Sequence, residues 1–197
     1  MKSSPLALTV LAMLNYAPLH PYGVQRLLKQ WGKDQVVNVG QRAGLYRTID
    51  RLLAAGLIEV QGTGRDQQYP ERTVYEPTDA GRDTVHSWLE EMLASPKYEF
   101  PQFPAALSNV MLLMPDEARQ ALAQRAESLS ETLAVLDQSL DHEEQFGLPR
   151  VTMLESEYLR AVTSAELDWV RSVVADLDSG ALNWDEATLR ALAEQAA

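Results

Sequence analysis

The sequence predicts a mostly α-helical protein with one small β-hairpin, built as two modules. Three observations lead to this class. Apolar residues recur at the 3.6-residue helical period over most of the 197 residues. Two short runs rich in β-branched residues have the pattern of paired strands, and they follow a helix directly. The segment 95–104 carries three prolines and no periodicity, which is typical of a linker between modules.

Two short helices are predicted first. The first can be capped by Ser3 or Ser4, and it ends before Pro18. The second begins near Pro21 and ends at Gly32, where a C-terminal cap is expected. Its apolar face consists of Val24, Leu27, Leu28 and Trp31. We therefore expect two helices joined by a turn.

The third predicted helix, 40–55, has one apolar and one basic face. Its predicted core face consists of Leu45, Ile49, Leu52 and Leu53. Because helical side chains repeat every 3.6 residues, the other face presents polar and basic groups: Gln41, Arg42, Arg47 and Arg51. Gly56 then ends the helix by adopting a positive φ, which other residues adopt only at a cost.

A β-hairpin and a fourth helix complete the first module. The predicted strands are 57–60 and 73–78, and the polar segment between them holds Arg65 and Arg72. Thr78 is expected to cap the fourth helix, with acidic residues in the first turns. Its predicted buried side chains are Val85, Leu89 and Met92, with Trp88 beside them.

The second module is predicted to be helical throughout. An apolar helix over 105–113 precedes a long helix that opens at Pro115 and is broken by Gly147. Further helices are expected over 151–178 and 183–196. In the long helix, small and large apolar residues follow the alternating spacing of a coiled-coil seam: Leu122, Ala126, Leu129, Leu133, Leu136 and Leu140. The seam predicts either a dimer contact or a helical hairpin within one chain.

Charge is divided unevenly along the sequence. The net charge is −11, but residues 1–75 contain nine Lys and Arg against five Asp and Glu. Residues 95–197 contain seven against eighteen. A basic module followed by an acidic one is the pattern of a phosphate-facing domain attached to a solvated domain. Uneven surface charge with no partner is the alternative that charge alone leaves open.

Three helices followed by a two-stranded hairpin is the order of a winged helix-turn-helix, which we place at 1–94. In this fold the third helix enters the major groove of duplex DNA. Arg65 and Arg72 are then expected to reach phosphate or the minor groove. A linker over 95–104 leads to a helical dimerisation domain over 105–197, because two-fold DNA readers hold two recognition helices about 34–36 Å apart.

The sequence resembles the PadR-type transcriptional regulators. The stretches GLYRTIDRLLAAGLIE and YEPTDAGRDTVHSWL carry the similarity. The matching positions are Gly44, Leu45, Tyr46, Gly56, Leu57, Ile58, Tyr75, Thr78 and Gly81. The helical region after the linker is similar to the dimerisation module of the longer PadR subfamily. Arg47 departs from the pattern, since many members have proline there, and the wing lacks the basic run of many relatives.

The resemblance implies a cytoplasmic, homodimeric, DNA-binding repressor that an effector relieves. Its partners would be a pseudo-palindromic double-stranded operator, a second copy of the chain and a small apolar or aromatic effector. The expected DNA contacts are Gln41, Arg42, Tyr46, Arg47, Arg51, Arg65 and Arg72. The expected dimer contacts are Leu122, Leu129, Leu133, Leu136, Leu140 and Trp169. The aromatic candidates for an effector pocket are Trp88, Phe100 and Phe103.

Other functions compete with this interpretation. The acidic net charge favours a winged-helix adaptor that binds proteins instead of DNA. An enzyme is not expected, because the three histidines are far apart and no catalytic or phosphate-loop motif is present. No metal or other cofactor is expected, since the chain has no cysteine and the acids of 141–144 point in different directions on a helix. No apolar run approaches the roughly 18 residues of a membrane span.

Several site residues keep a purely structural alternative. Tyr46 either donates its hydroxyl to a phosphate or packs its ring between helices with the hydroxyl at the surface. The arginines of the third helix are alternatively a solvated face with Asp50 as a neighbour. Trp88 and Trp169 stand at helical spacing and are alternatively core residues.

Overall fold

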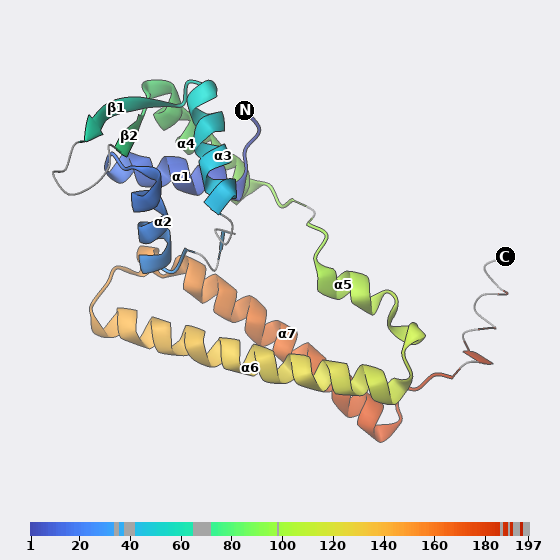
Figure 1. The fold of residues 1–197 in the computed structure, drawn as a ribbon. Coiled ribbons are helices and arrows are strands. Elements are labelled where there is room, and N and C mark those ends of the chain that lie inside the picture. The colour runs from blue at the N-terminus through green and yellow to red at the C-terminus, as the bar shows by residue number, and fades with distance from the viewer. Residues whose placement is uncertain are drawn as a thin grey trace. The chain divides into compact units, whose positions relative to one another are not determined.

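The structure, a computed structural model, describes residues 1–33, 36–37, 42–64, 72–97, 99–185, 187–188, 190 and 194. The chain divides into an N-terminal unit, Met1–Glu99, and a C-terminal unit, Phe100–Ala197. Figure 1 shows helices throughout both units and a two-stranded antiparallel hairpin in the first. The predicted fold class is confirmed.

The first two helices begin at side-chain caps. Helix α1 spans Pro5–Tyr16, and the Ser4 hydroxyl oxygen accepts from the backbone N–H of Ala7 at 3.2 Å. Helix α2 spans Pro21–Gln30, and the Nδ1 atom of His20 accepts from the backbone N–H of Gly23 at 2.8 Å. The proline at the first position of each helix has no N–H to leave unpaired. The His20 cap was not predicted.

Helix α3 spans Arg42–Ala54 and presents its predicted core face with one change. Leu45, Ile49 and Leu52 are buried, and the fourth buried position is Thr48, whose hydroxyl donates to the carbonyl oxygen of Gly44. Leu53, predicted as core, is exposed. It follows Leu52 by 100° around the helix, which carries it past the edge of the buried stripe.

The wing is longer than predicted and has an additional neighbour. Strand β1 spans Ile58–Gly64 and pairs with β2, Arg72–Pro77, with a bulge between Val60 and Gly62. In the turn before α2, the backbones of Leu19 and Tyr75 exchange hydrogen bonds of 3.1 and 3.0 Å. The turn between the first two helices is therefore fastened to β2 of the wing.

Helix α4 spans Asp79–Ala94 and begins at the predicted Thr78 cap. Val85 is buried as predicted, and Trp88 is buried rather than merely adjacent. Leu89 is exposed, so its predicted burial is wrong. The buried positions Gly81, Val85 and Trp88 follow one another by four and three residues and so form one row along the helix. Leu89 follows Trp88 by 100° around the helix and lies outside that row.

The C-terminal unit contains two short helical pieces and two long helices. The predicted helix over 105–113 is wrong: α5 spans Gln102–Leu107, and a separate 3-10 turn, η2, spans Val110–Leu112. The long helices are α6, Pro115–Gln145, and α7, Leu154–Ser179, joined through the 3-10 turn η3, Arg150–Thr152. Half of the residues of the predicted final helix over 183–196 lie outside the described residues.

Helices α6 and α7 pack along each other as a hairpin. The buried apolar side chains between them are Ala118, Leu122, Leu136, Leu167 and Val170. Three ion pairs join the two helices: Arg119 with Asp178, Arg125 with Glu166, and Arg160 with Asp137. A hairpin within one chain therefore accounts for the buried part of the leucine seam.

The first turn of α4 meets the turn after α3 at very short range. A Cβ atom at Gly81 would lie 1.9 Å from the carbonyl oxygen of Leu57. No side chain fits at this distance, and the obstacle is backbone that cannot rotate away. The two segments can approach this closely only because residue 81 is glycine.

We expect Gly81→Ala to lower the free energy of unfolding by about 1–3 kcal/mol, because the backbone must shift to admit the methyl group. Urea denaturation measures this change. Gly44→Ala in α3 is the matched control, since its Cβ would meet nothing within 4 Å. Alanine in a helix is favoured over glycine by about 0.5–1 kcal/mol, so the control should be slightly more stable. Equal stability of the two variants would contradict the close contact.

Candidate nucleic-acid interface

The outward face of α3 carries the predicted basic groups that the structure describes. Arg47 and Arg51 are exposed and one helical turn apart, on the side away from buried Leu45 and Leu52. Tyr46 lies beside them with 49% of its surface exposed. These three side chains can therefore reach a ligand without any rearrangement of the core.

The described guanidinium groups of this face are available to a ligand. Among the described residues, neither Arg47 nor Arg51 takes part in an ion pair. In the C-terminal unit, by contrast, Arg150 binds Glu157 at 2.8 Å, and its hydrogen bonds lower the pKa of that carboxyl. Guanidinium groups without a protein carboxylate remain available to phosphate or base edges, for which their planar fork of donors is suited.

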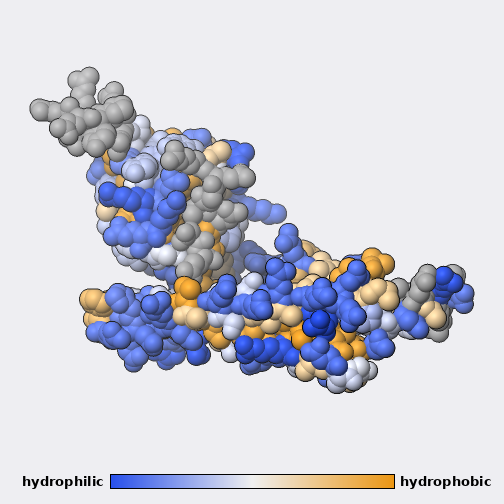
Figure 2. Space-filling view, turned by 60° about the horizontal axis from the view of Figure 1, so that its bottom comes forward, coloured by the Kyte–Doolittle hydropathy of each residue, from blue (hydrophilic) through white to orange (hydrophobic). Residues whose placement is uncertain are grey.

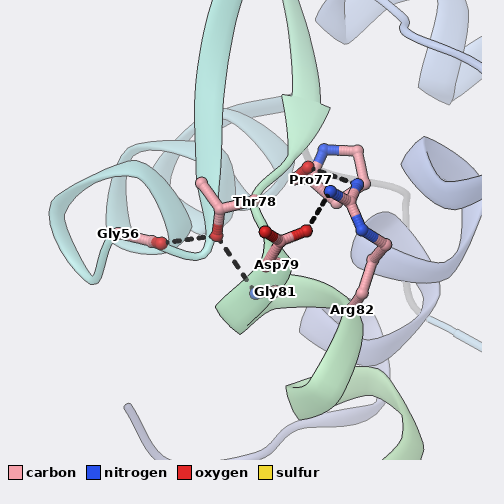
Figure 3. A network of polar contacts seen from close by, with 6 residues as sticks. All are labelled: Gly56, Pro77, Thr78, Asp79, Gly81 and Arg82. Carbon is pink, nitrogen blue, oxygen red and sulfur yellow. Dashed lines mark hydrogen bonds and ion pairs between the residues drawn. The ribbon is translucent and has the colours of Figure 1, made fainter.

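A network of hydrogen bonds fixes the end of α3 to the wing and to α4 (Figure 3). The Thr78 hydroxyl donates to the carbonyl oxygen of Gly56 at 2.7 Å and accepts from the N–H of Gly81 at 3.1 Å. The Thr78 N–H donates to the Leu57 carbonyl at 3.1 Å. Gly56 has φ +66°, as predicted for the residue that ends the helix. One threonine thus joins α3, the second strand and the next helix.

A second contact strengthens the same corner. One guanidinium nitrogen of Arg82 donates to the carbonyl oxygen of Pro77 at 2.8 Å, and another binds Asp79 at 2.6 Å (Figure 3). The arginine therefore holds the end of β2 against the first turn of α4. Because this pair is exposed, its main effect is to position the backbone, and its contribution to stability is small.

A hollow of about 420 Å³ lies beside the basic face, between α2, α3 and β2. Its lining includes Tyr46 and Asp50 from α3, His20 and Tyr22 at the start of α2, and Tyr75 from the wing. The Tyr46 ring stands at this hollow with half its surface exposed. Both interpretations of Tyr46 therefore stay compatible with its position.

Four of the predicted DNA-contacting side chains are not placed. Gln41 and Arg65 lie outside the described residues. Arg42 begins α3 and Arg72 begins β2, but their side chains are not among the described ones. For these four residues the predicted contacts stay predictions.

The three aromatic candidates for an effector pocket are not brought together. Trp88 is 7% exposed and belongs to the hydrophobic core of the N-terminal unit, which fits the core alternative; its role in an effector pocket stays a prediction. Phe100 is 91% exposed. Phe103 is half-buried against Trp169, with ring centroids 6.1 Å apart, and the guanidinium carbon of Arg125 lies 3.6 Å from the centre of its ring.

The predicted dimer contacts fall into two groups. Leu122 and Leu136 are buried within the chain, because the α6–α7 hairpin covers them; they are not free to bind a second copy. Leu129, Leu133 and Leu140 are half-buried. Trp169 is 46% exposed.

A row of exposed apolar side chains follows one face of α7. Its members, which we call the α7 stripe, are Leu154, Tyr158, Val162 and Trp169. Figure 2 shows apolar patches reaching the surface of this unit between hydrophilic ones. Helix α6 leaves this row uncovered, as the exposed fractions of its side chains show.

Two other kinds of site were tested among the described residues. They hold no group of three His, Asp or Glu side chains close enough to share a metal ion. Within the same residues no helix combines the length and the apolar character needed to cross a bilayer.

Solved structures share this fold. Bacillus subtilis PadR in complex with operator DNA matches with a TM-score of 0.73 at 20% identity, covering 87% of this chain and 98% of that one. The same protein in complex with p-coumaric acid matches at 0.69, with 19% identity and coverage of 89% and 99%. The Vibrio cholerae virulence activator AphA matches at 0.65, with 20% identity and coverage of 88% and 98%. No protein-family model matches the sequence, and no curated protein does. The predicted PadR-type fold is confirmed.

We expect Thr78→Val, which keeps the shape but loses the hydroxyl, to lower the free energy of unfolding by about 0.5–2 kcal/mol. Two backbone groups, the Gly56 carbonyl and the Gly81 N–H, lose a partner in this variant. Thr78→Ser keeps the hydroxyl and should retain most of the stability in urea denaturation.

Thr84→Val is the matched control in the same helix, because the Thr84 hydroxyl donates only to the Ala80 carbonyl one turn earlier. Its stability should stay within a few tenths of a kcal/mol of the parent, since such back-bonding adds little to a helix. An equal loss in Thr84→Val would mean that Thr78 has no special role at this corner.

Proposed function

We propose that this chain is a PadR-type transcriptional regulator that binds duplex DNA through α3 and has no enzymatic activity. The observation that carries the proposal is the pair of exposed, unpaired guanidinium groups on a helix that occupies the recognition position of a winged helix-turn-helix. The shared fold supports it, since one of the structures with that fold holds operator DNA.

In the proposed complex, α3 lies in the major groove. A recognition helix reads base edges with its exposed face while the elements around it contact the backbone. Arg47 and Arg51, one turn apart, would contact successive positions along the groove, as guanine edges or as phosphates. Tyr46 would donate its hydroxyl to a neighbouring phosphate, and Arg65 and Arg72 of the wing would reach the flanking backbone.

We further propose that the working species is a homodimer on a pseudo-palindromic operator. A two-fold dimer presents two copies of α3 to half-sites one helical turn apart, about 34–36 Å. The α7 stripe is the surface that supports this assembly, because exposed apolar rows on a soluble protein mark interaction sites. A self-complementary contact of this stripe with its own copy satisfies two-fold symmetry.

The regulator is proposed to be a repressor of the cytoplasm that a small aromatic effector releases from DNA. PadR, which has the same fold, has been solved with p-coumaric acid. An effector acts by binding more tightly to the dimer conformation with one spacing of the two recognition helices than to the conformation with another spacing. The difference between its two affinities limits how far it can shift the equilibrium between these conformations.

A protein-binding adaptor is the second candidate, and the net charge of −11 favours it. An adaptor would show no affinity for duplex DNA that depends on salt. A regulator that neutralises several phosphates loses affinity steeply as salt rises, because counterions are released on binding. A titration at several salt concentrations therefore separates the two functions.

We expect Arg47→Ala and Arg51→Ala to weaken operator binding by about 1–3 kcal/mol each if the side chain reads a base. If it contacts a phosphate, the loss should be uniform across sequences, and the slope of log K against log salt should become shallower by about one. Fluorescence anisotropy with labelled operator measures both quantities.

The control is Arg150→Ala, which also removes one exposed arginine but one already paired with Glu157. Its affinity for DNA should match the parent. Binding that is unchanged in both α3 variants would remove this helix from the interface.

We expect Val162→Glu, which places a charge in the α7 stripe, to weaken the dimer at least tenfold. Light scattering over a dilution series measures the dimer dissociation constant. Ala175→Glu adds the same charge at an exposed position about 140° around α7 from Val162, and its dimer should be unchanged. If both variants dimerise like the parent, the stripe is not the dimer surface.

A further inference from the structure

The C-terminal unit contains an apolar cavity that the DNA face does not use and that shares only Trp169 with the α7 stripe. We propose that it binds a neutral aromatic molecule of one or two rings. This goes beyond the proposed effector by naming its place and its chemical class. Its effect on DNA rests on the proposed function, whereas its binding to the cavity does not.

The cavity has the size and the lining of a small-molecule site. Its volume is about 400 Å³, within the range of 300–1,000 Å³ typical of ligand pockets. Four segments contribute apolar walls: α5 and η2, α6, α7, and the chain after α7. The apolar lining residues are Leu107, Val110, Met111, Leu122, Trp169, Val173, Leu177, Leu182 and Trp184.

The chain after α7 is held in place to form one wall. Gly180, with φ +75°, ends α7, and the N–H of Leu182 donates to the Asp176 carbonyl at 3.0 Å. The indole N–H of Trp184 donates to the carbonyl oxygen of Leu113, 71 residues earlier, at 2.8 Å. Trp184 is only 9% exposed. Its ring is therefore a fixed wall, and a flat ligand can stack or pack edge-on against it and against Trp169.

The electrostatics of the cavity favour a neutral ligand. None of the lining residues that the structure describes is charged. Thr188, at the lining, donates its N–H and its hydroxyl to Asp185, each at 2.8 Å. The backbone hydrogen bond from Thr188 lowers the pKa of the Asp185 carboxyl, so this group is ionised at neutral pH. An anionic ligand would lose its hydration without gaining a cation from the described lining, and the carboxylate that binds Thr188 would repel it.

Among the described lining residues there is no arginine of the two long helices. Arg125 binds Glu166, and Arg119 lies 3.5 Å from Asp178. Asn183 and Thr188 supply the polar groups of the lining. One hydroxyl or amide on the ligand is therefore the polar group that the site can match, while a carboxylate is disfavoured.

The test compares naphthol with naphthoate, which share their rings and differ in charge. Calorimetric titration of the full chain at neutral pH, without DNA, should show naphthol binding one per chain and at least tenfold tighter than naphthoate. Asp185→Asn, which keeps an acceptor for Thr188, should narrow this difference. Val173→Trp, which fills the cavity, should abolish naphthol binding, while Val60→Trp on the exposed wing strand should leave it unchanged.

The comparison of the two ligands uses the unaltered protein, so it does not depend on the folding of any variant. Absence of naphthol binding, or equal binding of the two ligands, would overturn the proposal. Naphthol binding that appears only when Val162→Glu separates the dimer would also overturn it, because the second copy would then occupy the cavity. Duplex affinity is measured separately, so its loss with naphthol binding intact would reject the DNA function alone.

Discussion

The N-terminal unit depends on one close approach of two backbones, the Leu57 carbonyl over Gly81. Any side chain at residue 81 would collide with that carbonyl, whose oxygen would lie 1.9 Å from its Cβ. The contact brings the first turn of α4 under the turn that follows α3, where the Thr78 hydroxyl can reach both Gly56 and Gly81. Helix α3, the wing and α4 therefore share one corner. A winged helix needs this, because a helix and a wing that read one duplex must keep a fixed relative position.

Much of the first unit was predictable because its determinants are local. Proline and serine at the start of α1, glycine after α3 and threonine before α4 act within a few residues of their own position. The errors lie where burial depends on packing. Leu53 and Leu89 sit one residue beyond a buried position, where a period of 3.6 does not decide between edge and core. The pairing of Leu19 with Tyr75 is a single bridge, which leaves no alternating pattern in the sequence.

The position of the candidate site on α3 was predictable, but whether its arginines form ion pairs was not. Helical periodicity placed Arg47 and Arg51 on the outward face. Whether a guanidinium is paired depends on residues far along the chain: Arg125 and Glu166 are 41 residues apart, and no spacing rule joins them. The same holds for the cavity, whose Trp184 wall is fixed by a carbonyl 71 residues away. For the α7 stripe too, the packing of α6 decides which apolar residues stay uncovered.

The acidic net charge and a DNA-binding role are compatible because charges act over short distances. At physiological ionic strength the interaction between exposed charges is largely screened beyond about 8 Å, so a phosphate bound at α3, as proposed, would respond mainly to charges of that helix such as Arg47, Arg51 and Asp50. In the C-terminal unit, arginines such as Arg125 and Arg160 are neutralised by carboxylates of the facing helix. The unit is left acidic, and under the proposed function it would repel phosphates. The uneven division of charge would then direct DNA to α3 by repulsion from the C-terminal unit as well as by attraction to Arg47 and Arg51.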